Sequence, residues 1–178
     1  MALAPGNLPL GMAGLFISGV LAVNLLSFSG KADTRDAAVF NVLAAVIATA
    51  VAFHAWLVGG SALYGSQTLL FAITYWWMGF NLYRGVEDQR AFGWYCLFVA
   101  LNVIPFAFYT FKSEAYILGF NWLLWGLAWF MFWVLLALRR QEYFRLMLAV
   151  TWFTTIVLWF CSLGWLIGWM DFQRFYGF

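Results

Sequence analysis

Long uninterrupted runs of hydrophobic residues alternate with short polar segments along the whole chain. The runs lie at about 11–29, 37–58, 66–83, 91–111, 115–138 and 146–170. None of them contains an Asp, Glu, Lys or Arg, and all such residues lie outside them. Because a helix needs roughly 20 apolar residues to cross a bilayer, the pattern predicts six transmembrane helices in one all-α domain, 1–178.

The continuity of the runs favours helices over a membrane β-barrel, whose strands alternate apolar and polar residues over about ten positions. Only Lys112, Ser113 and Glu114 separate the fourth and fifth runs, a connection short enough for an antiparallel helix pair. The segment that follows the second run, Gly59 to Gly65, is also short and carries no charge.

Basic residues are concentrated in alternate connecting segments. Seven of the nine basic residues follow the first, third and fifth runs: Lys31, Arg35, Arg84, Arg90, Arg139, Arg140 and Arg145. The other segments hold only Lys112 and Arg174. The positive-inside rule therefore predicts that these three loops are cytoplasmic and that both termini lie outside.

The composition supports a membrane protein without a soluble catalytic domain. The chain is 66% hydrophobic and 9% charged, with a mean hydropathy of +0.87, whereas soluble domains average about 25% charged residues. We find no Gly-x-Ser-x-Gly, phosphate-binding loop or His-Glu-x-x-His motif, so the chain is not expected to be an enzyme or to hold a cofactor. Cys96 and Cys161, both inside apolar runs, are interpreted as small buried hydrophobes rather than metal ligands.

The polar residues inside the runs are uncharged. They include Asn24, Asn41, His54, Thr74, Asn81, Asn102, Asn121, Thr151, Thr154 and Thr155. Such side chains can hydrogen-bond an amide or a water molecule, but they hold an ion only weakly. A proton-coupled transporter would need a buried ionisable group, and only His54 is available, so the pattern favours movement of a small neutral molecule.

Four tryptophans form a stripe along the fifth run. Trp122, Trp125, Trp129 and Trp133 are spaced three, four and four residues apart, which places them on one helix face. Trp122, near the outer end, also fits an interfacial belt. For the other three, packing against another helix and lining a pore are equally good explanations. In a pore, flat rings would set a slot width and offer both apolar faces and N–H donors to a planar solute. A second one-sided stripe, Thr74, Trp77 and Asn81, lies in the third run.

The segment from Gly93 to Pro105 contains Trp-Tyr-Cys-Leu-Phe-Val-Ala-Leu-Asn-Val-Ile-Pro. It resembles the WYxLFVAxNxxP signature of the AmiS/UreI family of bacterial amide and urea channels, and weaker similarities occur in four other runs. The resemblance implies six helices arranged as three hairpins around a central pore. It also implies a homohexamer in the bacterial inner membrane, with one channel in each protomer and a cytoplasmic amidase or urease as functional partner.

The resemblance places Trp122, Trp129 and Trp133 at family positions of the channel constriction, and Asn24 matches a family Asn. Ile73 and Trp77 occupy positions where acid-gated urea channels carry Phe and Tyr. Together with the residue patterns, this predicts a substrate path lined by Trp122, Trp125, Trp129, Trp133, Ile73, Thr74, Trp77, Asn81, Asn24, Asn102 and Thr151.

We therefore expect a passive channel for short aliphatic amides such as acetamide, with urea as a further solute and membrane lipid as its surroundings. Acid-activated urea channels carry a long external loop rich in His and acidic residues after the second span. Gly59 to Gly65 has none, so the resemblance implies a pH-insensitive channel. The alternatives are a dedicated urea channel that supplies a cytoplasmic urease, and an accessory membrane subunit with no transport role.

Overall fold

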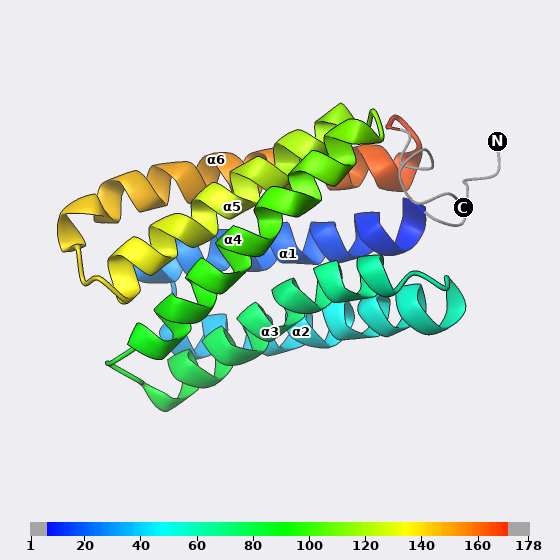
Figure 1. The fold of residues 1–178 in the computed structure, drawn as a ribbon. Coiled ribbons are helices and arrows are strands. Elements are labelled where there is room, and N and C mark those ends of the chain that lie inside the picture. Colours follow the sequence, from blue (N-terminus) through cyan, green and yellow to red (C-terminus); the bar gives the residue numbers. More distant parts are fainter. Residues whose placement is uncertain (1–6, 171–178) are drawn as a thin grey trace.

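The computed structural model describes residues 7–170, which form six long helices arranged side by side (Figure 1). The α-helices are α1 (Asn7–Phe28), α2 (Thr34–Phe53), α3 (Ala62–Arg84), α4 (Arg90–Lys112), α5 (Tyr116–Leu136) and α6 (Phe144–Ile167). A π-helical turn, η1 (His54–Val58), extends α2, and a 3-10 turn, η2 (Gln141–Tyr143), precedes α6. The termini that we predicted to lie outside, and Arg174, fall outside the described residues.

Local sequence signals explain where several helices begin and end. The Asp33 carboxylate caps α2 by accepting hydrogen bonds from the backbone N–H groups of Arg35 at 2.8 Å and Asp36 at 3.1 Å. The Ser61 hydroxyl caps α3 by accepting from the Tyr64 N–H at 3.2 Å. Because α3 begins at Ala62, the loop that follows η1 is only Gly59–Ser61, shorter than the segment expected from the sequence.

Consecutive helices are neighbours, and the last helix packs against the first. The largest contacts are between α2 and α3, between α4 and α5, and between α1 and α6, while α3 and α4 make the smallest contact of the ring. Two of the three main pairs are hairpins, whereas α1 and α6 meet without a connecting loop (Figure 1). This closed order leaves an interior that is lined by α1, α3, α4, α5 and α6.

Five helical segments of the described chain are long and apolar enough to cross a membrane: Gly11–Phe28, Thr34–Val58, Arg90–Lys112, Tyr116–Leu136 and Gln141–Ile167. The sixth, α3, is 23 residues long but less hydrophobic. Its polar residues Gln67, Thr68, Thr74 and Asn81 are buried. The lower hydropathy of α3 therefore reflects its inward face rather than its outer surface.

Glycines allow close approach inside the two hairpins. A Cβ on Gly65 would lie 3.0 Å from the Ala52 carbonyl oxygen, and one on Gly79 would lie 3.2 Å from that of Ala38, so α2 and α3 nearly touch through their backbones. A Cβ on Gly93 of α4 would lie only 2.6 Å from the backbone nitrogen of Ala137, just after α5. A side chain at Gly93 would therefore clash with the backbone, and one at Gly65 or Gly79 would be tightly packed.

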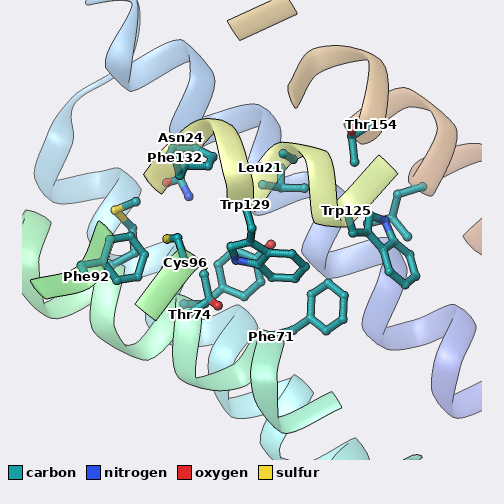
Figure 2. A pocket seen from close by; sticks show the side chains of 14 residues that line it. Leu21, Asn24, Phe71, Thr74, Phe92, Cys96, Trp125, Trp129, Phe132 and Thr154 are labelled. Carbon is teal, nitrogen blue, oxygen red and sulfur yellow. The ribbon is translucent and has the colours of Figure 1, made fainter. Parts of the chain in front are cut away.

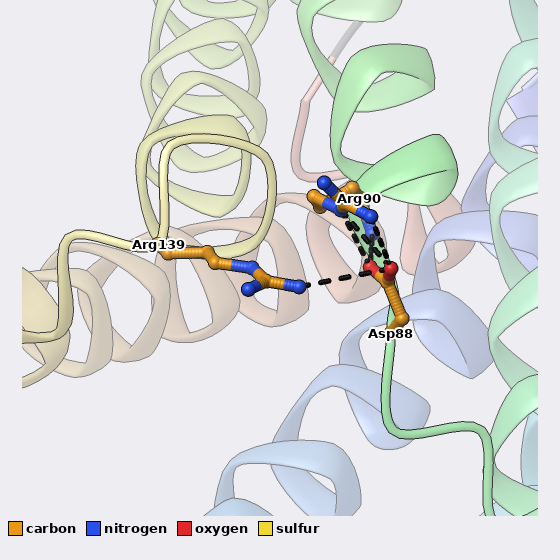
Figure 3. Close-up of polar contacts among 3 residues, drawn as sticks. All are labelled: Asp88, Arg90 and Arg139. Carbon is orange, nitrogen blue, oxygen red and sulfur yellow. Dashed lines mark hydrogen bonds and ion pairs between the residues drawn. The ribbon is translucent and has the colours of Figure 1, made fainter.

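An ion-pair cluster joins two loops at one end of the bundle (Figure 3). Asp88, in the α3–α4 loop, accepts hydrogen bonds from Arg90 with a shortest distance of 2.6 Å, and Arg139, after α5, lies 3.6 Å from the same carboxylate. The hydrogen bonds from Arg90 lower the pKa of Asp88 to about 2. The carboxylate therefore stays ionised near neutral pH and links the beginning of α4 to the end of α5.

We predict that Gly93→Ala destabilises the α4–α5 hairpin. Alanine is normally the better helix former by about 1 kcal/mol, but here its methyl group would force the helices apart. The expected loss is about 1–3 kcal/mol of unfolding free energy, as for other overpacked cores. Thermal unfolding in detergent measures the change, with Ala91→Leu on the exposed face of α4 as the control. An unchanged midpoint for Gly93→Ala would contradict the packing described.

Candidate functional site

Two small cavities lie inside the ring of helices. The first, called the central cavity, has a volume of about 40 Å³ and is drawn in Figure 2. Its lining comprises Leu21, Asn24, Phe71, Thr74, Tyr75, Met78, Phe92, Cys96, Trp125, Ala128, Trp129, Phe132, Thr154 and Leu158. These residues come from α1, α3, α4, α5 and α6, so nearly the whole ring contributes to one enclosed space.

The second, called the end cavity, lies closer to the beginning of α1 and has a volume of about 30 Å³. It is lined by Ala13, Gly14, Ile17, Tyr64, Gln67, Thr68, Phe71, Leu118, Trp122, Trp125, Leu158 and Trp165. Phe71, Trp125 and Leu158 line both cavities and therefore stand between them. A single water molecule needs a cavity volume of roughly 10–15 Å³, so each of these cavities holds only a few atoms.

Phe71 of α3 faces a row of three tryptophans on α5. Its ring centroid lies 6.0 Å from that of Trp122, 5.0 Å from that of Trp125 and 4.7 Å from that of Trp129. Trp122 and Trp125 contact each other edge to face at 4.8 Å. Figure 2 shows Phe71, Trp125 and Trp129 grouped beside the central cavity. The boundary between the cavities is therefore made largely of rigid aromatic rings, with Leu158 beside them.

Most hydroxyl groups near the cavities bond to their own helix. Thr68 donates to the Tyr64 carbonyl at 3.0 Å, Thr74 to the Leu70 carbonyl at 2.8 Å and Thr154 to the Val150 carbonyl at 2.9 Å. This arrangement uses the hydroxyl proton locally and leaves each oxygen able to accept a further hydrogen bond. These threonines are thus better acceptors than donors toward a solute.

Asn24, on the wall of the central cavity, is held by Asn41 of α2. The Asn24 amide nitrogen donates to the Asn41 side-chain oxygen at 3.0 Å, and the Asn41 nitrogen donates to the Asn24 oxygen at 2.6 Å. Asn41 also donates to the Ala37 carbonyl at 2.8 Å. Because both carboxamides are buried, the pair fixes α1 against α2 and sets the orientation of the one amide that reaches the cavity.

Three buried indole N–H groups of the described residues have no partner, and two of them belong to tryptophans that line a cavity. The Nε1 atoms of Trp122 and Trp125 are buried and have no hydrogen-bond partner within residues 7–170. A buried donor without a partner costs about 1–3 kcal/mol, and both indoles belong to residues that line a cavity. A carbonyl oxygen of a small solute would satisfy such a donor.

No Asp, Glu, Lys, Arg or His lines either cavity. The described residues also contain no group of three or more His, Cys, Asp or Glu side chains able to hold a metal ion. An ion in this apolar space would lose its hydration without gaining a counter-charge, at a cost far above that of a neutral polar molecule. The geometry suits small, planar, uncharged solutes that offer a carbonyl group.

Five of the residues predicted to line the path do reach a cavity. Trp125, Trp129, Thr74 and Asn24 line the central cavity, and Trp122 lines the end cavity. They come from three helices that are distant in sequence. The structure therefore brings together most of the predicted tryptophan stripe with one residue from the third-run stripe.

Three other predicted residues of α3 and α5 lie away from both cavities. Ile73 is 44% exposed on the outside of the bundle. Trp77 packs between α3 and α4, with its ring centroid 5.6 Å from that of Tyr95. Trp133 continues the tryptophan stripe, but at this level α5 faces Trp94 of α4, whose ring centroid is 5.9 Å away.

The remaining predicted residues are Asn81, Asn102 and Thr151. Asn81 and Thr151 are buried among helices, and neither lines a cavity. Asn102 lies on the outer side of α4, where its amide donates to the Phe98 carbonyl of the same helix at 2.8 Å. The WYxLFVAxNxxP segment thus contributes Cys96 rather than Asn102 to the cavity wall.

Phe71 and Tyr75 line the central cavity from α3, although neither was predicted from the sequence to do so. Both are apolar enough to pass for ordinary core residues. The available signal was their spacing, because Phe71, Thr74, Tyr75 and Met78 follow the three- and four-residue steps of one helix face. The aromatic residues with which α3 lines the central cavity are therefore Phe71 and Tyr75, whereas the predicted Ile73 and Trp77 lie away from it.

Residues 10–169 match the sequence model of a protein family described as "AmiS/UreI family transporter". A Rhodococcus erythropolis protein that is named as a transporter, AmiS2, is 32% identical to this chain over 142 residues. The match covers 76% of this chain and 68% of that protein. A Mycolicibacterium smegmatis protein, named as a transporter of amidate substrates, is 33% identical over 74% of this chain and 64% of its own length. The chain thus spans about two thirds of these relatives.

The acid-activated urea channel of Helicobacter pylori is 31% identical over 153 residues, covering 67% of this chain and 78% of that protein. The cryo-EM structure of the H. pylori urea channel in a closed state superimposes with a TM-score of 0.75 at 23% identity. It covers 91% of this chain and 100% of the channel chain, which establishes the shared fold. The matching family and the named relatives are transporters or channels, not enzymes.

We predict that the Asn24–Asn41 pair is energetically coupled. Asn41→Leu should lower the free energy of unfolding by about 1–3 kcal/mol, because it leaves the Asn24 carboxamide buried without partners. The double variant Asn24→Leu/Asn41→Leu should lose less than the sum of the two single variants. Unfolding in detergent, analysed as a double-mutant cycle, measures the coupling. Additive losses would show that the two hydrogen bonds contribute nothing as a pair.

Proposed function

Because the chain belongs to the AmiS/UreI family of transporters, we propose that it is a passive membrane channel for short aliphatic amides such as acetamide, with urea as a second solute. The observation that carries this proposal is the uncharged cavity system divided by Phe71 and the tryptophan row, with unused N–H donors on Trp122 and Trp125. The names of the relatives, which refer to amidate substrates and to urea, support the same class of solute.

The proposed route passes from the end cavity to the central cavity. A carboxamide would accept a hydrogen bond from an indole through its oxygen, donate through its NH₂ group to a threonine oxygen, and lay its flat face against Phe71. Urea and acetamide each have four non-hydrogen atoms, a size comparable to the space in either cavity. Ions and bulky solutes would be excluded by desolvation and by width, respectively.

The proposed setting is the bacterial inner membrane, with α3 as the sixth span. The loops that follow α1, α3 and α5 lie at one end of the bundle. These loops and the adjoining helix ends hold the seven basic residues that the positive-inside rule assigns to the cytoplasm. A homohexamer, with one path in each protomer, and a cytoplasmic amidase that consumes the amide belong to the same proposal. Both follow from the family resemblance.

A dedicated urea channel that supplies a urease is the second candidate, and the similarity to the H. pylori urea channel favours it. The two candidates differ in the relative fluxes of acetamide, propionamide and urea. Measured on one proteoliposome preparation, a flux of urea far above that of both amides would favour the second candidate.

We predict that Trp125→Ala and Phe71→Ala relax the size selection of the channel. Each removes an aromatic wall, whose contacts contribute about 0.5–1.5 kcal/mol, or roughly a two- to tenfold change in relative flux. The flux of butyramide should rise relative to that of acetamide in a stopped-flow liposome assay. Trp169→Ala, at a tryptophan that is 75% exposed, is the control and should match the wild type. Unchanged selectivity in both cavity variants would argue against this path.

We also predict that flux is insensitive to external pH between about 5 and 7.5, the range in which imidazole ordinarily titrates. The loop Gly59–Ser61 has no titratable side chain, and His54, the only histidine, lies exposed in η1 away from both cavities. Proteoliposome uptake at the two pH limits, with His54→Ala as a matched variant, tests this expectation. A several-fold rise on acidification that His54→Ala abolishes would refute it.

A further inference from the structure

A groove unrelated to the cavities runs on the outer surface of the α2–α3 hairpin. It has a volume of about 240 Å³ and is lined by Ala38, Val39, Val42 and Leu43 of α2 and by Gly79, Phe80 and Tyr83 of α3. The side chains on its rim are well exposed, with Val39 and Phe80 both at 53%. No segment of residues 7–170 fills this groove.

The groove is shaped by two small residues at the hairpin contact. Gly79 and Ala38 bring the helix backbones together, since a Cβ on Gly79 would lie 3.2 Å from the Ala38 carbonyl oxygen and 3.0 Å from a Val42 methyl group. The larger neighbours Leu43, Phe80 and Tyr83 stand on either side of this floor. The result is an apolar groove between two helices, a shape that suits a hydrocarbon chain.

Two arginines lie at the same end of the groove. Gly79 is level with the segment Ala38–Val42 of the antiparallel helix, so Arg84, five residues later, is level with Arg35. Arg35 also precedes Val39 by one turn, and Arg84 follows Phe80 by one turn, which places each arginine on the face that borders the groove. Both are exposed, as is Tyr83 beside them at 66%.

The charges of these arginines are not neutralised by ion pairs among the described residues. The ion pairs of this end involve Arg90 and Arg139 with Asp88, and Arg140 with Glu142. The nearest acidic side chains along the chain are Asp33, Asp36 and Glu87, of which Asp33 accepts two backbone N–H groups at the beginning of α2. Arg35 and Arg84 are therefore available to an external anion.

We propose that this groove is a binding site for one anionic phospholipid of the cytoplasmic leaflet. An acyl chain would lie between Val39, Leu43 and Phe80, while the phosphate and headgroup would be held by Arg35 and Arg84, with the Tyr83 hydroxyl at the level of the headgroups. Basic pockets between helices on the cytoplasmic side are a known mode of headgroup recognition, and paired guanidinium groups suit phosphate oxygens. The inference rests on the proposed membrane orientation but not on solute transport.

The test uses purified full-length protein in dodecyl maltoside with added phosphatidylglycerol or phosphatidylcholine. Bound lipid is counted by native mass spectrometry, and the unfolding midpoint is measured in the same samples. Phosphatidylglycerol should remain bound and raise the midpoint by about 5 °C more than phosphatidylcholine at saturating lipid. Arg35→Gln/Arg84→Gln should abolish this difference. Arg140→Gln/Arg145→Gln, which removes the same charge at the same end, should retain it.

A second pair of variants tests the groove without altering charge. Val39→Phe fills the groove and should abolish phosphatidylglycerol retention. Val46→Phe, two turns further along the same face of α2 and equally exposed, should not. Equal responses to the two lipids, or equal losses in both arginine pairs, would overturn the proposal. Dissociation of an oligomer by Val39→Phe alone, with no lipid effect, would assign the groove to a second copy of the chain instead. Solute flux enters none of these readouts, so failure here leaves the channel proposal intact.

Discussion

The exclusion of ionised side chains from the helix interiors constrains every other feature of this protein. In a bilayer, a polar group must find its partner within the protein, and here nearly every threonine hydroxyl near the cavities bonds to the carbonyl four residues earlier in its own helix. The Asn24–Asn41 pair applies the same solution across two helices. The interior is thereby electrically neutral, with few donors left unused.

The indole N–H groups without partners stand out because most other donors of the interior are already hydrogen-bonded. If most hydroxyl protons are already engaged, the indole N–H groups of Trp122 and Trp125 become the principal donors on the cavity walls. Indole rings are rigid, so they hold a donor and a flat apolar face in fixed relation. A carboxamide needs both features, whereas an ion needs a counter-charge. The chemistry of the cavity walls thus suits the class of solute that appears in the names of the related proteins.

Close helix packing keeps the cavities small. Gly65, Gly79 and Gly93 each lie close to the backbone of the neighbouring segment, where a methyl group would be tightly packed or, at Gly93, would clash. The hairpins are consequently narrow and rigid, and the aromatic side chains of α3 and α5 meet across the centre of the ring. The close contact at Gly79 also forms the floor of the outer groove.

The sequence alone determined the number of helices, their approximate limits and the neutrality of the interior, because these depend on local hydrophobicity and on the placement of charges such as Lys31 and Arg145. It also identified the tryptophan stripe from helical spacing. Only the tertiary structure decided which residues of a stripe reach a cavity. Trp125 and Trp129 do, whereas Trp133 meets Trp94, because α5 faces a different neighbour at that level. Periodicity assigns residues to a helix face, but the packing of the other helices decides what that face contacts. For this reason Phe71 lines the cavities and Asn102 does not.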